Sequence, residues 1–213
     1  MNKERAQPTA DKIDAAPAEH QQTRSEQILD IACRLFGEKG FDRTSLRDIS
    51  DAAGITKAAL YYHFPDKDAL QHKVVNDSLN ALIAFVRLRL SEIDDPLERV
   101  RTYFFATTEF YQNHTSAWTA GSNSFWSSSA DRRASTVALR DEFEGILRDA
   151  IRDAIAAGNL RPVDPALAGR FLLGSMNHVM RWHSPNGALS MSEVNEQYLD
   201  FALNGLKPRD CDA

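Results

Sequence analysis

Residues 57–64 carry the side chains in this chain best suited to contacting a nucleic acid. At about 100° per residue in a helix, one side carries a polar and aromatic set: Lys57, Ala58, Tyr61 and Tyr62. The opposite side is apolar apart from one histidine: Ala59, Leu60, His63 and Phe64. A charged donor, a small apolar group and two phenols suit contact with base edges and backbone in a DNA groove.

Two short helices joined by one glycine are predicted to position this surface. Ser45 caps the first helix, with Asp48 three residues later in a capping box. Gly54 supplies the left-handed residue that ends the first helix. Thr56 caps the second, which Pro65 ends after about two turns. Such a pair places a short helix in the major groove, although an ordinary helical hairpin with exposed tyrosines fits the same pattern.

Residues 23–75 resemble the DNA-binding domain of the TetR (tetracycline-repressor, also AcrR) family of bacterial regulators. The resemblance rests on these pieces: Phe36-Gly37, Gly40-Phe41, Thr44-Ser45, Arg47-Asp48-Ile49, Ala53-Gly54-Ile55, Leu60-Tyr61-Tyr62-His63-Phe64 and Lys67-Asp68-Ala69-Leu70. It implies an all-α fold of about nine helices. A three-helix, helix-turn-helix DNA-binding head would be joined to a larger helical body that binds an effector and forms a homodimer.

The resemblance also assigns roles to individual residues of the head. It implies base contacts from Arg47, Lys57, Ala58 and Tyr61. It implies phosphate contacts from Arg24, Thr44, Ser45, Thr56, Tyr62, His63 and Lys67. The helical wheel turns His63 inward, whereas the family usually has it near a phosphate. Ala59 departs from the Gly or Thr that the family often has there, which removes a possible phosphate donor.

The rest of the chain is predicted to be helical as well. Cap and stop signals predict further helices over about 23–38, 66–90, 95–113, 130–157, 164–183 and 190–205, and the Gly-, Ser- and Asn-rich residues 118–129 predict short or irregular ones. We divide the chain into an arm (1–22), a helix-turn-helix domain (23–67), an effector-binding and dimerisation domain (68–207) and a tail (208–213). The arm is polar and is expected to be disordered.

Composition excludes several classes of protein. The net charge is −5, but most of the acid excess lies in residues 76–213, so the head itself is balanced. Two cysteines are too few for a disulfide framework or a metal site, and the histidines show no metal-ligand spacing. The chain has no nucleophile elbow, zinc-protease motif or phosphate-binding glycine loop. We therefore expect no enzyme, metal or cofactor. No apolar run approaches a membrane span of about 20 residues, and we expect a cytoplasmic protein.

Aromatic residues of the body suggest an effector pocket. The candidates are Phe104, Thr108, Tyr111, Trp118, Phe125, Trp126 and Met176. A packed core is the alternative for each of them. Residues 164–187 resemble family members that control fatty-acid, steroid or aromatic catabolism, some of which sense acyl-CoA esters. The effector would then be an acyl-CoA or an aromatic compound, and Arg132, Arg133 or Arg181 could face its phosphate.

The last two helices carry wide apolar faces that would pair in a dimer. The interface candidates are Leu172, Val179, Leu199, Ala202, Leu203 and Leu206, with an internal core as the alternative. We predict a repressor whose effector-free dimer binds a palindromic, double-stranded operator and is released by a small hydrophobic or acyl-type effector. A helix-turn-helix activator, an effector-independent regulator and a helical dimerisation adaptor are the other possibilities.

Overall fold

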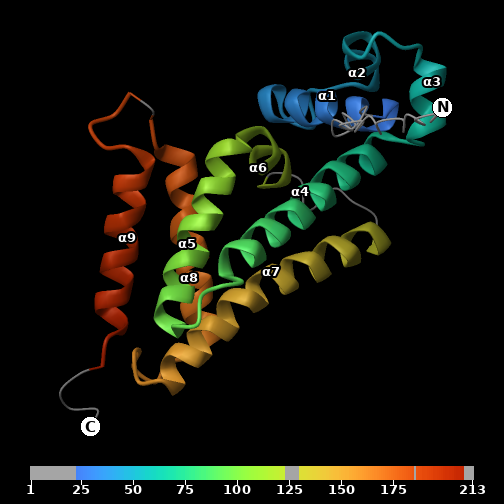
Figure 1. Ribbon diagram of the computed structural model, residues 1–213. Coiled ribbons are helices and arrows are strands. Elements are labelled where there is room, and N and C mark those ends of the chain that lie inside the picture. Colours follow the sequence, from blue (N-terminus) through green and yellow to red (C-terminus); the bar gives the residue numbers. More distant parts are fainter. Residues whose placement is uncertain (1–22, 123–129, 185, 209–213) are drawn as a thin grey trace, which may run out of the picture.

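The computed structural model describes residues 23–122, 130–184 and 186–208, which form nine α-helices and no strand (Figure 1). This confirms the predicted all-α fold. The helices are α1 (Arg24–Lys39), α2 (Leu46–Ala52), α3 (Lys57–His63), α4 (Lys67–Leu90), α5 (Pro96–Asn113), α6 (Thr115–Ser122), α7 (Ala130–Ala156), α8 (Pro165–Trp182) and α9 (Met191–Leu206). Among the described residues, no helix is both long enough and apolar enough to cross a bilayer.

Side-chain caps begin most of these helices at the residues that the sequence indicates. Capping boxes begin α1, α2 and α9, at Thr23, Ser45 and Ser190. Asp66 caps α4 by accepting the N–H of Ala69. An aspartate followed by a proline begins both α5 and α8, because proline is preorganised for the first helical turn. The short helix predicted around residues 118–129 is confirmed in part: α6 has 8 residues and begins at Thr115, directly after α5. Residues 123–129 lie outside the described part of the chain.

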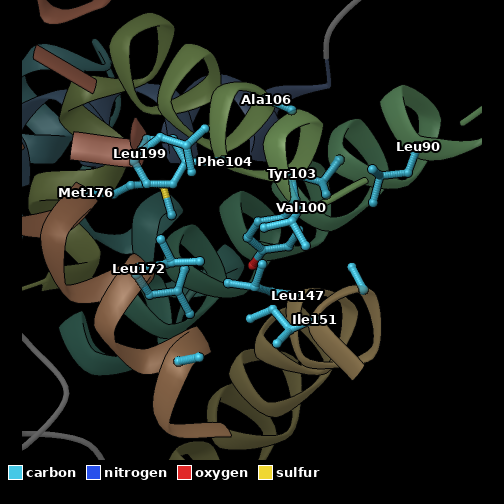
Figure 2. Packing of buried hydrophobic residues seen from close by; sticks show 14 of the residues in the cluster. Leu90, Val100, Tyr103, Phe104, Ala106, Leu147, Ile151, Leu172, Met176 and Leu199 are labelled. Atoms are coloured by element: carbon cyan, nitrogen blue, oxygen red, sulfur yellow. The ribbon is translucent and has the colours of Figure 1, made fainter. Parts of the chain in front are cut away.

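Two apolar clusters divide the fold into a head and a body. The head cluster lies among α1, α2, α3 and the first turns of α4, and is centred on Ile28, Phe36, Ile49 and Leu60. The body cluster lies among α4, α5, α7, α8 and α9 and includes Tyr103, Phe104, Leu147, Leu172 and Met176 (Figure 2). Helix α4 contributes to both clusters, so it connects the head to the body as one continuous rod (Figure 1).

Helix α1 meets α6 in a second contact between head and body. Gly37 of α1 lies so close to Ser116 of α6 that an added Cβ would stand 2.8 Å from the Ser116 Cα. Real Cβ atoms do not approach a backbone carbon so closely, so the glycine is what permits this crossing.

Polar side chains at the start of α7 tie it to the start of α4. The Arg132 guanidinium donates to both carboxylate oxygens of Asp66, at 2.8 and 2.9 Å. Further along the same two helices, Thr136 donates to the Asn76 side-chain oxygen at 2.8 Å. The Ser135 hydroxyl lies 2.7 Å from His72 Nε2. The cap of α4 is therefore shared with a helix of the body.

Candidate DNA-binding surface and body cavity

Helices α2 and α3 are held as a rigid pair by their buried faces. Ile49 of α2 and Leu60 of α3 are fully buried in the head cluster, and Phe64 is nearly so. Gly54 has a φ of 62°, the left-handed conformation that the turn requires. The Ile55 N–H then donates to the Ser50 carbonyl at 3.0 Å and closes the turn.

The outer face of α3 is exposed, as contact with DNA would require. Lys57 and Ala58 are exposed, Tyr61 is 45% exposed and Tyr62 is 88% exposed. The Lys57 ammonium lies 5.7 Å from the centre of the Tyr61 ring, one helical turn away. A lysine, a methyl group and two phenols therefore stand together on one side of α3, where they can reach hydrogen-bond acceptors and thymine methyls.

The residues predicted on α2 and at the helix ends are also exposed. Arg47 extends from α2 with its side chain 85% exposed, 3.6 Å from Asp51. Ser45 and Thr56 are exposed caps whose hydroxyl oxygens accept backbone N–H groups. Ser45 also donates to Asp48 at 2.6 Å, and this hydrogen bond is the main cause of the lowered pKa of Asp48. Thr56 accepts the Ala59 N–H at 3.1 Å.

Arg24 lies at the start of α1, next to the turn between α2 and α3. It is exposed, but its Nη2 donates to the Ala53 carbonyl at 2.7 Å and its Nη1 donates to Gln27 at 2.8 Å. It therefore ties α1 to the helix-turn-helix, and its remaining N–H groups carry a positive charge at the same surface.

One predicted phosphate contact is wrong, and another residue has a second role. Thr44 is 1% exposed, and its hydroxyl points inside, toward the carbonyls of Gly40 at 2.8 Å and Leu35 at 3.2 Å. Lys67 donates to the carbonyls of Phe41 and Thr44, at 2.9 and 3.0 Å, and lies over the Phe41 ring. Only one of its three N–H groups is left for a phosphate. Both residues hold the loop between α1 and α2.

His63 is half-buried at the end of α3. Its ring lies edge-on to Tyr62, with centroids 5.5 Å apart, and 6.5 Å from the ring of Phe64. This position is intermediate between the inward one from the helical wheel and the outward one implied by the family resemblance.

A cavity of about 320 Å³ opens in the body among α4, α5, α6, α7 and α8. Its lining is mixed in character: Val75, Ser78, Leu79, Leu82, Phe110, Tyr111, His114, Trp118, Arg140, Phe143, Glu144, Leu173, Asn177 and Arg181. Ligand sites combine apolar walls with convergent polar groups, and this lining has both, with an unusually large polar share. Burial raises the pKa of the Tyr111 phenol to about 12 and lowers the pKa of the Arg140 guanidinium.

The predicted pocket residues divide between this cavity and the core. Tyr111 and Trp118 line the cavity. Phe104 and Met176 do not; they are buried in the body cluster (Figure 2). Thr108 is also buried, and its hydroxyl donates to the Phe105 carbonyl at 2.9 Å. Phe125 and Trp126 lie outside the described residues.

Apart from Tyr111 and Arg181, the polar residues of the cavity wall were not predicted from the sequence. On α8, Leu173, Asn177 and Arg181 follow one another at intervals of four, and on α7, Arg140, Phe143 and Glu144 share a face. The polar residues among these could have been predicted from the sequence, because each interrupts an apolar stripe at helical spacing. Arg132, considered for a ligand phosphate, instead pairs with Asp66, whereas Arg181 does line the cavity.

Five of the six predicted dimer residues point into the protomer, so these five predictions are wrong. Leu172, Val179, Leu199, Ala202 and Leu203 are buried in the protomer, and Leu206 packs partly against the body cluster. The apolar stripes we selected on α8 and α9 fill the internal core. Different large apolar side chains face outward on these helices: Leu167 (69% exposed), Phe171 (62%), Trp182 (47%) and Phe201 (67%).

Three of these exposed residues lie at one end of the α8–α9 pair. The Arg161 N–H, just before α8, donates to the Leu206 carbonyl at the end of α9 at 2.8 Å. The two helices therefore run antiparallel, with the start of α8 beside the end of α9. Leu167 and Phe171 on α8 and Phe201 on α9 are accordingly at the same end, and we call them the outer apolar face.

The described residues contain no cluster of side chains suited to binding a metal ion. Nowhere in residues 23–122, 130–184 or 186–208 do three His, Cys, Asp or Glu side chains gather in an arrangement that could hold a metal ion. Cys33 is a free, half-buried thiol, and burial raises its pKa.

Two family profiles match the chain. Residues 28–74 match "Bacterial regulatory proteins, tetR family", and residues 93–206 match "Tetracyclin repressor-like, C-terminal domain". The HTH-type transcriptional repressor KstR2 of Mycobacterium tuberculosis is 29% identical over 186 residues, which cover 86% of this chain and 93% of the relative.

Two solved structures have similar folds over nearly their whole length. The TetR-family regulator PfmR from Thermus thermophilus superposes with a TM-score of 0.77 and 36% identity, covering 85% of this chain and 99% of PfmR. AibR in complex with isovaleryl coenzyme A and operator DNA superposes with a TM-score of 0.77 and 27% identity, covering 87% of this chain and 99% of AibR.

Proposed function

This chain belongs to the TetR family of bacterial transcriptional regulators, and we propose that it is a repressor whose dimer binds a palindromic operator and is released by a small-molecule effector. The observation that carries the proposal is the exposed face of α3. Leu60 and Phe64 anchor that helix from behind, while Lys57, Tyr61 and Tyr62 project outward. A recognition helix needs this division between a buried and an exposed side.

Base reading falls to Arg47, Lys57, Ala58 and Tyr61. Residues near the start of a recognition helix contact base edges, and Lys57 is the first residue of α3. An arginine or lysine donor suits guanine, and the Ala58 methyl suits thymine. The exposed hydroxyls of Thr56 and Tyr62, together with Arg24, would hold phosphates and so fix the position of the head on the duplex. Ser45 already donates its one hydroxyl proton to Asp48, so it is left out of this set.

A homodimer is proposed because one head alone covers too little DNA. Two heads about one helical turn apart read a palindrome, and the second head binds at high effective concentration once the first is engaged. We place the dimer contact on the outer apolar face, where Leu167, Phe171 and Phe201 are exposed at one end of the α8–α9 pair. A second copy of this chain is the occupant that a two-headed regulator requires.

The cavity among α4 to α8 is the proposed effector site. AibR, with the same fold, was solved with isovaleryl coenzyme A and operator DNA, which supports an acyl-CoA as one candidate class here. A volume of about 320 Å³ is at the small end for ligand sites, so it suits the acyl or ring portion of such a ligand. Release requires that the effector bind the non-DNA-binding state more tightly. We assign no catalytic step, and a cytoplasmic location follows from the partner DNA.

The test starts from a pool of random duplexes. The purified protein should select a palindrome and bind it, in fluorescence anisotropy, at least about 1,000-fold more tightly than random duplex. Lys57→Ala and Tyr61→Ala should each weaken that binding, whereas Lys207→Ala, an exposed lysine beyond α9, should not. Enrichment of no sequence, or equal binding by all four proteins, would overturn the assignment.

A further inference from the structure

A hydrogen bond joins α6 to α8 at the wall of the cavity. The indole Nε1–H of Trp118 donates to the Asn177 side-chain oxygen at 3.2 Å, and both residues belong to the cavity lining. A ligand in the cavity can therefore reach both residues of this bond. Asn177 can offer the indole one acceptor, and a ligand oxygen placed beside Trp118 would compete with it.

The cavity has an apolar end and a polar end. Leu82, Phe110, Phe143 and Leu173 form the apolar end. Asn177 and Arg181 follow Leu173 by one and two turns of α8. Ser78 precedes Leu82 by one turn of α4, in the direction of the head. Ser78, Asn177 and Arg181 thus lie toward α6 and the head, and they would orient an amphipathic ligand with its polar end that way. Arg140 and Glu144, in contrast, flank Phe143 on α7.

The polar end favours a ligand that accepts hydrogen bonds. Two arginines line the cavity, Arg140 and Arg181, against one carboxylate, Glu144. Gln71 lies one turn closer to the head than Val75, on the face of α4 that also carries Ser78 and Leu82. It is 2% exposed, and among the described residues its Nε2 has no hydrogen-bond partner. Groups that can only donate, the two guanidiniums and the Trp118 indole, therefore outnumber the one carboxylate in the cavity lining.

Helix α6 carries any change at Trp118 directly to the head. Ser116, two residues before Trp118, is the residue against which Gly37 of α1 packs at backbone distance. At so close a crossing, a shift of α6 cannot be absorbed by side-chain rearrangement alone. Movement of Trp118 is therefore passed to α1, which belongs to the head cluster through Ile28 and Phe36.

We propose that the Trp118–Asn177 hydrogen bond is the effector sensor of this protein. It would hold α6 in the DNA-binding position until a ligand bearing an acceptor at its head-side end takes the indole N–H. The effector class is then an amphipathic molecule, apolar at one end, with a carboxylate or carbonyl oxygen at the other. This inference rests on the proposed function of the cavity, and it adds the hydrogen bond that responds to the ligand.

The first test removes the bond without a ligand. Trp118→Phe keeps an aromatic ring and lacks the donor, and Asn177→Leu keeps the bulk and lacks the acceptor. Each variant should bind the selected palindrome about fivefold more weakly than wild type, the equivalent of one neutral hydrogen bond. Because both remove the same bond, the double variant should lose no more than either single one.

The matched control is Asn80→Leu, the same substitution at an exposed position of α4, which should bind as wild type does. Unchanged binding by Trp118→Phe and Asn177→Leu would overturn the sensor, and so would additive losses in the double variant. If one of the two single variants loses its helical circular dichroism, the operator affinity of the other single variant decides the test. A wild-type protein that selects no palindrome would instead refute the proposed function.

The second test uses two probes of equal shape. Naphthoate has a carboxylate, and methylnaphthalene has the same rings and no acceptor. Naphthoate should release labelled palindrome from the wild-type protein at lower concentration than methylnaphthalene, and this difference should disappear in Trp118→Phe. Equal responses of the wild-type protein to the two probes, including no response to either, would overturn the acceptor requirement.

Discussion

Lys67 supports the loop between α1 and α2 from the first residue of α4. Its ammonium donates to two backbone carbonyls, those of Phe41 and Thr44, and lies 4.1 Å from the centre of the Phe41 ring. Lys67→Ala should therefore lower the free energy of unfolding by about 1–3 kcal/mol, measured by urea denaturation. Lys73→Ala, which removes only an exposed pair with Asp77, should cost about 0.3–0.5 kcal/mol. Equal losses would contradict the supporting role.

Arg47 should affect sequence preference more than overall affinity. Its side chain is exposed on α2, with one loose ion pair to Asp51 that is worth little. Arg47→Ala should cost about 1–3 kcal/mol per head on the palindrome and relax preference at one base pair. Tyr62→Phe, which removes a phenol proposed to hold phosphate, should weaken all duplexes alike. Anisotropy against single-base operator variants measures both, and identical profiles would exclude the division of roles.

Individual residues of the head were predictable where the helical wheel separates two sides. Lys57, Tyr61 and Tyr62 are exposed and Leu60 is buried, because a short helix packed on one side leaves only one choice. Thr44 was not predictable in this way. It lies in a loop, where periodicity carries no information, and its hydroxyl satisfies two carbonyls that only the folded loop brings together.

Among the helices, the α1–α6 crossing depends on one glycine. Gly37→Ala would place a Cβ 2.8 Å from the Ser116 Cα and 3.1 Å from its carbonyl oxygen. The two helices must then separate, at a cost of about 1–3 kcal/mol. Gly145→Ala on α7, where an added Cβ meets nothing within 4 Å, should instead stabilise the protein by about 0.5–1 kcal/mol. Thermal and urea unfolding of both variants would show whether each substitution raises or lowers the free energy of unfolding. Stabilisation by Gly37→Ala would exclude the close crossing.

The ion pair between α7 and the cap of α4 should appear in the pH dependence of stability. The Arg132 guanidinium, by hydrogen bonding, holds the pKa of Asp66 below its ordinary value of 3.8. In acid, the unfolded chain therefore binds the proton more readily than the folded protein. The stabilisation is complete above about pH 5 and is lost as the pH falls through the folded pKa.

Asp66→Asn tests this pair, because asparagine still caps a helix but cannot form the ion pair. The wild-type protein should be more stable than Asp66→Asn near neutral pH, and the difference should shrink as the pH falls below about 4. Asp77→Asn on the same helix serves as the control. Urea denaturation over a pH series measures the difference, and a constant gap between wild type and Asp66→Asn would count against the pair.

Helix positions were predictable from caps, but the partners of helix faces were not. Asp95-Pro96, Asp164-Pro165 and the Ser190–Glu193 box begin helices as expected, since capping is a local interaction. On α8 and α9, however, apolar residues occupy both the inner and the outer face. Leu172 and Leu199 are buried while Phe171 and Phe201 are exposed. Periodicity finds an apolar stripe without saying whether the protomer or a second copy covers it.

In the molecule as a whole, two helices connect the cavity of the body to the head. Helix α4 lines the cavity with Val75 and Leu82 and enters the head cluster with Leu70 and Val74. Helix α6 lines it with Trp118 and packs on α1. An effector that alters the relation of these helices changes the orientation of each head. In a dimer, small rotations of two heads change their spacing on DNA, so operator binding is more sensitive than either protomer's stability.

The spacing between two heads is fixed only if the outer apolar face joins two protomers. Phe171→Glu and Phe201→Glu place a charge on a surface that a partner would bury, so each should shift the protein toward monomer in sedimentation velocity. Operator affinity should fall at least about tenfold, because the second head no longer binds at high effective concentration. Leu88→Glu is the control, since Leu88 is 72% exposed near the end of α4, away from α8 and α9, and it should leave both measurements unchanged. If the glutamate variants stay dimeric while Leu88→Glu dissociates, the contact lies at the end of α4 instead.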